Sequence, residues 1–125
     1  MDDKLNRIKQ IDKENIIWII YIGIIILSWY SNSKEKKYIL YNDLESKKEY
    51  QNIIIFIFLV LVVIYYYFVK DGYEDVEKLK ESDSDKKKDL TYLSFTGQML
   101  ILISGIIFLY IALVDDDIDV ELAFN

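Results

Sequence analysis

Three long apolar runs alternate with charged segments along this chain. The runs cover about residues 16–30, 53–69 and 93–114, and none of them contains Asp, Glu, Lys, Arg or His. A helix of roughly 20 apolar residues crosses the hydrocarbon core of a bilayer. A soluble fold would instead need three helices that are apolar on every face, with almost nothing to cover them. The pattern therefore predicts an all-α integral membrane protein, a single domain of residues 1–125 with three transmembrane helices.

The first run, residues 16–30, is short, about 22 Å at helical rise, so it must draw on its flanks or cross with little tilt. Aromatic residues suited to the membrane interface mark its ends: Trp18, Tyr21, Trp29 and Tyr30. Gly23, near its middle, offers a contact point for another helix. A secretory signal peptide is the alternative, since a basic segment precedes the run and residues 31–33 read Ser-Asn-Ser. We expect a retained span, preceded by a helical lead-in.

The second run carries no Gly, Ala or Ser, so we expect it to face lipid more than the third run does. Asn42 followed by Glu45 is a capping pair, which predicts that the second helix begins near Asp43. Beyond the run, apolar positions continue one helical face to about Lys80, and Gly72 is where a bend would fall.

A short polar segment, residues 82–85, separates the second helix from the third and reads Ser-Asp-Ser-Asp. Ser82 together with Asp85 suits the N-terminal cap of the third helix. Because the connection is short, we expect the second and third helices to form an antiparallel hairpin that extends beyond the bilayer.

The third run has the best packing surface of the three. At helical spacing one face holds Ser94, Gly97, Ile101, Gly105, Phe108 and Ala112, with Gln98 and Ser104 beside it. Small residues let helix backbones approach closely in lipid, and a polar side chain such as Gln98 tends to hydrogen-bond across helices. The sequence thus predicts a third helix at the centre of packing. The predicted helix-packing residues are Gly23, Ser94, Gly97, Gln98, Ser104, Gly105 and Ala112.

The basic residues are divided unequally between the two sides that three spans create. Ten of the 15 Lys and Arg residues fall in the N-terminal tail and the loop between the second and third spans. Cytoplasmic segments carry the excess of Lys and Arg, so we predict that the N-terminus lies inside and the C-terminus outside. The C-terminal tail, residues 115–125, is acidic and contains no basic residue.

Composition argues against several classes of chemistry. The chain has neither Cys nor His, which removes thiolate catalysis, the usual proton shuttle and the commonest metal ligand. With no Asp, Glu, Lys, Arg or His in a span, neither a coupled transporter nor a membrane hydrolase is expected. We predict no catalytic residue, no metal site and no cofactor.

The carboxylates of the tail could bind a hard cation, but a solvated acidic tail is the preferred interpretation. The net charge of −6 and the absence of a basic stripe argue against nucleic-acid binding.

Three stretches of the chain resemble a known group of proteins. The end reads LISGIIFLYIA over residues 102–112 and ELAFN over residues 121–125, and the beginning reads DKENIIWIIY over residues 12–21. These stretches resemble the ends and the start of small, uncharacterised three-span membrane proteins encoded in AT-rich genomes. The resemblance implies the three-span architecture and carries no activity.

These observations favour a non-enzymatic membrane protein that acts by helix packing in the lipid bilayer. It would be a small subunit, a regulator or an immunity-type protein, packing with itself or with a larger membrane partner. The alternative is a self-assembling membrane pore of holin type. A wide aqueous pore needs a polar stripe, however, and the third span offers four polar positions: Ser94, Thr96, Gln98 and Ser104. Ion flux from liposomes would separate the two hypotheses.

Overall fold

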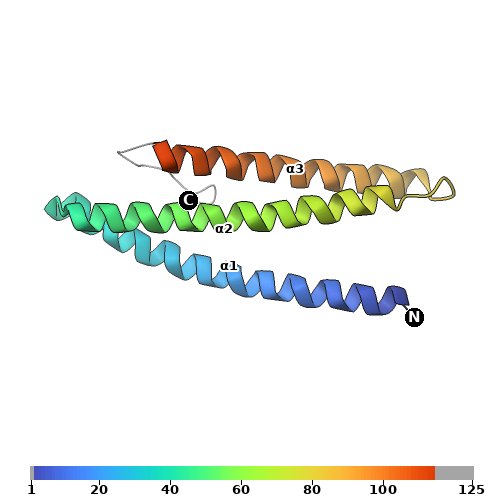
Figure 1. Cartoon of the computed structure of the whole chain (residues 1–125), viewed down its shortest axis with the longest axis horizontal. Helices are drawn as coiled ribbons and strands as arrows, with labels where there is room; N and C mark the ends of the chain where they lie inside the picture. The colour runs from blue at the N-terminus through green and yellow to red at the C-terminus, as the bar shows by residue number, and fades with distance from the viewer. Residues whose placement is uncertain (1, 115–125) are drawn as a thin grey trace. The chain divides into compact units, whose positions relative to one another are not determined.

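The computed structural model describes residues 2–114, which form three α-helices in sequence: α1 (Asp2–Tyr41), α2 (Leu44–Glu77) and α3 (Asp85–Val114) (Figure 1). No strand occurs within these residues. The predicted all-α class with three helices long and apolar enough to cross a membrane is confirmed. The acidic tail, residues 115–125, lies outside the described residues.

Each helix is longer than the apolar run that predicted it. The helices have 40, 34 and 30 residues, which at 1.5 Å per residue gives about 60, 51 and 45 Å, against a hydrocarbon core of about 30 Å. The three apolar runs fall inside α1, α2 and α3 in that order. The charged ends of the helices therefore continue well past the apolar stretches.

The polar residues that follow the first apolar run predict a connection from residue 31, but only Asn42 and Asp43 separate α1 from α2, because α1 continues to Tyr41. Asn42 has a positive φ of 51°, a left-handed conformation that Asn tolerates better than most residues. The carboxylate of Asp43 accepts hydrogen bonds from the Glu45 N–H at 3.2 Å and the Ser46 hydroxyl at 2.9 Å. The cap of α2 is therefore Asp43 and not the predicted Asn42. The bond from Ser46 is the main cause that lowers the pKa of Asp43.

The turn between α2 and α3 is held by two side chains. The Asp83 carboxylate accepts a hydrogen bond from the Lys80 N–H at 2.8 Å and contacts the Lys87 ammonium at 3.2 Å. The Ser84 hydroxyl accepts a hydrogen bond from the Lys87 N–H at 3.1 Å, which makes Ser84 the cap of α3 in place of the predicted Ser82. The helix α2 ends at Glu77, close to the predicted end, and passes Gly72 without interruption.

The chain divides into two compact units, the first ending at Ile57 and the second beginning at Phe58. Within the first unit, α1 lies antiparallel to the start of α2. The Lys34 ammonium and the Tyr30 hydroxyl both contact the Glu49 carboxylate, at 3.2 and 3.5 Å. This hydrogen bond to Glu49 is the main cause that raises the pKa of Lys34.

The second unit pairs the rest of α2 with α3. The rings of Phe58 and Phe108 stack at 5.8 Å between centroids, and those of Tyr73 and Phe95 lie 6.1 Å apart. As the residue number rises along α2, it falls along α3. The two segments are therefore antiparallel, as the predicted hairpin requires.

Burial is greatest on α2, so the expectation that the second span faces lipid more than the third, which would be the packing centre of the chain, is wrong. In the most apolar window of each helix, 28% of residues are buried in α2, 17% in α1 and 11% in α3. The reason is that α2 contributes to both units, whereas α3 contributes to one. Its bulky residues are accordingly buried: Ile54, Ile57, Phe58, Leu61 and Ile64.

Candidate functional site

Two of the predicted packing residues of α3 lie in tight surroundings. A Cβ atom added to Gly105 would come within 3.0 Å of the Tyr65 ring and 3.5 Å of the Val62 side chain, both on α2. Ala112, two turns further along α3, is 2% exposed. Gly105 thus marks a close contact of helices within the second unit.

Other predicted packing residues are not used inside the described part of the chain. A Cβ atom added to Gly97 or Gly23 would meet no atom within 4 Å. Ser94 and Ser104 are exposed, and the exposed fraction of Ile101 is 50%. We call Ser94, Gly97, Ile101 and Ser104 the open stripe of α3. Whether this stripe and Gly23 contact another chain stays a prediction.

Gln98 lies against Gly72, where the absence of a side chain leaves room for its amide. A Cβ atom at Gly72 would collide with the Gln98 side-chain oxygen and would lie 3.4 Å from the Phe95 ring. That oxygen is buried, and no group within residues 2–114 donates a hydrogen bond to it. The interhelical hydrogen bond expected of Gln98 is therefore not made through this oxygen. In the sequence, Gly72 suggested only a bend or a helix end.

Three buried serines were not anticipated from the sequence. Ser31 is fully buried, and Ser28 and Ser46 are nearly so. The hydroxyl oxygens of Ser28 and Ser31 have no hydrogen-bond partner within residues 2–114. These small side chains belong to α1 and the first turn of α2. Their positions in a predicted span end and a predicted connection gave no signal that they would be buried.

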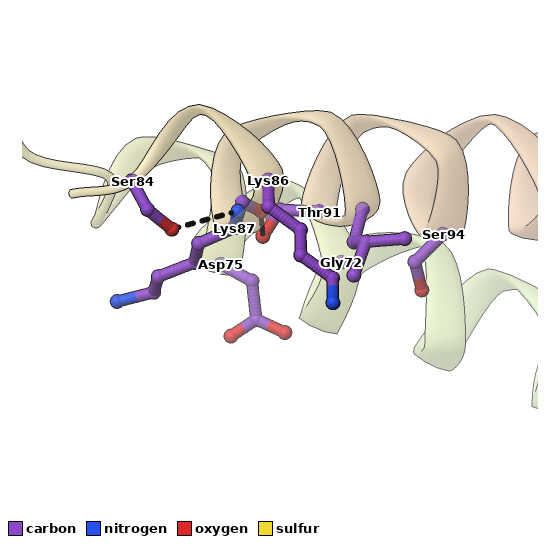
Figure 2. A pocket seen from close by; sticks show the side chains of 8 residues that line it. Gly72, Asp75, Ser84, Lys86, Lys87, Thr91 and Ser94 are labelled. Atoms are coloured by element: carbon purple, nitrogen blue, oxygen red, sulfur yellow. Dashed lines mark hydrogen bonds between the residues drawn. The ribbon is translucent and has the colours of Figure 1, made fainter.

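A pocket of about 460 Å³ opens at the end of the hairpin formed by α2 and α3 (Figure 2). Its lining comes from the last turns of α2, the connecting turn and the first turns of α3: Gly72, Asp75, Ser84, Lys86, Lys87, Leu90, Thr91 and Ser94. No sequence motif pointed to this pocket, because its residues become neighbours only when the hairpin closes.

The polar groups of the pocket divide into those already engaged and those still available. Lys87 pairs with Asp83, and the Thr91 hydroxyl donates to the Lys87 carbonyl at 2.8 Å. Within residues 2–114, the side chains of Asp75 and Lys86 take part in no hydrogen bond or ion pair, although both line the pocket. The available charges are therefore one carboxylate and one ammonium.

No metal-binding cluster of three or more Asp, Glu, His or Cys side chains occurs among residues 2–114. The pocket itself contains one carboxylate, two lysines and three hydroxyl side chains. The expectation that the chain is not an enzyme and holds no metal or cofactor stays a prediction, and so does cation binding by the tail, which lies outside the described residues.

Comparison with protein-family models found no match, and comparisons with curated proteins and with solved structures likewise found none.

Proposed function

We propose that the chain is a multi-pass membrane protein that acts non-enzymatically through helix packing, as a subunit, a regulator or an immunity-type protein. The observation that carries this proposal is the open stripe of α3, which offers small residues on the surface of an apolar helix. In lipid, such a surface favours close approach of another helix, either from a second copy or from a larger membrane partner.

Membrane insertion is supported by the large apolar side chains on the surface of the described helices. The exposed fraction is 76% for Trp29, 66% for Ile19 and 67% for Val63, and many other apolar residues are similarly exposed. Monomeric soluble proteins rarely expose continuous apolar patches of this kind. Lipid removes the need to bury these side chains within the chain.

The proposed orientation has the N-terminus inside and the C-terminus outside. It is supported by the Lys and Arg distribution described above. In the structure, the second loop, residues 78–84, follows the charged end of α2 and precedes three consecutive lysines in the first turn of α3. These lysines lie beyond the apolar stretch of α3, where a cytoplasmic surface would attract them.

Replacement of Gly97 tests the packing proposal. In the folded chain a larger side chain at Gly97 meets open space, so Gly97→Leu should fold normally and lose its contact to another chain. Ile106→Leu, on another face of α3 and also exposed, is the matched control. Crosslinking in native membranes and purification in mild detergent should show a homo-oligomer or a bound partner for wild type and Ile106→Leu, and should show neither for Gly97→Leu. Equal association of all three proteins would overturn the proposal, and ion flux from liposomes would favour the pore alternative.

A further inference from the structure

The pocket at the end of the hairpin lies at the depth of lipid headgroups if the chain is inserted as proposed, and this inference rests on that insertion. The apolar run of α2 ends at Val69, and Asp75 comes six residues later, about 9 Å further along the helix. On α3, Lys86 precedes the first apolar residue of the run, Leu93, by about 10 Å. The headgroup layer occupies roughly 5–8 Å on each side of the hydrocarbon core. Asp75 and Lys86 therefore lie just outside that layer, and Gly72, Leu90 and Thr91 of the pocket lining lie within it.

The available charges of the pocket distinguish between kinds of ligand. Lys87 is paired with Asp83, which leaves Lys86 as the available cation and Asp75 as the available anion. In Figure 2 the side chains of Asp75 and Lys86 extend toward the same open side of the hairpin. A simple anion would meet the unfavourable charge of Asp75, and a simple cation would meet Lys86. A ligand with both charges satisfies both side chains.

The geometry points to a zwitterionic phosphoethanolamine headgroup, presented by a phosphatidylethanolamine lipid, as the ligand of this pocket. Lys86 binds the phosphate, and the hydroxyl of Ser94 is a further donor in the pocket lining. Asp75 accepts hydrogen bonds from the primary ammonium, a charge-assisted contact that the quaternary amine of phosphatidylcholine cannot donate. Leu90 supplies an apolar wall, and the volume of about 460 Å³ is within the range of small-molecule sites.

Native mass spectrometry of the full-length protein in mild detergent tests this assignment. The protein is incubated with equal amounts of phosphatidylethanolamine, phosphatidylcholine and phosphatidylglycerol. Because a hydrogen bond to a charged group contributes strongly, retention of phosphatidylethanolamine should exceed that of the other two by about tenfold. Asp75→Asn should abolish the preference over phosphatidylcholine, and Lys86→Gln should weaken retention of all three lipids. Equal retention of the three lipids by wild type would overturn the proposal.

Charge-matched variants outside the pocket provide the controls. Asp89→Asn and Lys88→Gln change the same charges on the first turns of α3 without altering the pocket lining. Both should retain the wild-type preference, and a loss equal to that of the pocket variants would overturn the site.

Soluble phosphoethanolamine should compete only weakly, since it lacks the acyl chains. Binding of phosphoethanolamine as tight as that of the lipid would overturn the lipid as the source of the headgroup. Carbonate extraction separates the two proposals: a chain that stays in the membrane without lipid preference contradicts only the headgroup site, whereas a chain released by carbonate contradicts the proposed function.

Discussion

Gly105 of α3 lies against the ring of Tyr65 of α2, so closely that an added Cβ atom would come within 3.0 Å of a ring carbon. Such a distance is tighter than ordinary van der Waals contact, so an added side chain would require the ring or the backbone to shift. Gly97, eight residues earlier, is turned by about 80° around the helix axis and meets no atom within 4 Å. The two glycines therefore have different roles, although both belong to the face predicted from the sequence.

Replacement of the two glycines should separate folding from association. Gly105→Leu places a bulky side chain against Tyr65 and should destabilise the detergent-solubilised protein by about 1–3 kcal/mol. Gly97→Leu meets open space and should change the free energy of unfolding by less than about 0.5 kcal/mol. Reversible unfolding of both variants in mixed detergent measures the difference. Equal stabilities of Gly105→Leu and wild type would show that the Tyr65 contact is absent in the folded protein.

Substitution of Gln98 by Met should maintain or raise stability. The Gln98 side-chain oxygen is buried without a hydrogen bond from the described residues, and Met fills a similar volume without that polar atom. We expect a gain of up to about 1 kcal/mol in the free energy of unfolding. Gln98→Glu, which buries a charge at the same place, should be clearly destabilising. A marked loss of stability in Gln98→Met would mean that the amide has a partner in the folded protein.

The cap of α3 can be identified by paired alanine substitutions in the turn. Ser84 accepts the hydrogen bond of the Lys87 N–H, so Ser84→Ala should cost about 1 kcal/mol. Ser82→Ala should be silent, since Ser82 is exposed and precedes the cap by two residues. Thermal unfolding of the solubilised variants makes the comparison. The opposite order of effects would restore Ser82 as the cap.

The turn should loosen in acid because of Asp83. The backbone N–H of Lys80 and then the ammonium of Lys87 hold the pKa of Asp83 below its ordinary value. A pKa that is lower in the folded than in the unfolded chain means that the stabilisation is complete above pH ~4 and is lost as pH falls through the folded pKa. The Lys80 amide resonance, followed by NMR in micelles, should titrate with a midpoint below pH ~4. A midpoint at or above that pH would contradict the hydrogen bond.

The apolar runs were sufficient to predict three long helices and the hairpin of α2 and α3, because length and periodicity are local properties of a sequence. The extension of α1 over residues 31–41 was not predictable in this way. Its polar residues suggested a connection, but Ser31 is buried and Lys34 pairs with Glu49 of α2. This segment makes contacts with a distant part of the chain. No local sequence pattern contains such contacts.

The site residues show the same limit. Helical spacing placed Gly97 and Gly105 on one predicted face, but only the register of α3 against Tyr65 decides which of them is in contact. Asp75 and Lys86 gave no signal in the sequence, because the turn between α2 and α3 brings them to one pocket. The sequence shows a glycine at position 72, but it does not show that Gln98, on another helix, lies against it.

The most direct test of the three-span membrane topology is labelling of single cysteines in intact cells. The natural chain has no Cys, so each introduced Cys is the sole target of a membrane-impermeant thiol reagent. Ser33→Cys, exposed on α1 just beyond its apolar run, should react in intact cells, whereas Ser84→Cys, in the turn between α2 and α3, should react only after permeabilisation. A Cys added after Asn125 should react in intact cells. Labelling of Ser33→Cys and Ser84→Cys from the same side would contradict a membrane-crossing α2, and the reverse pattern would contradict the proposed orientation.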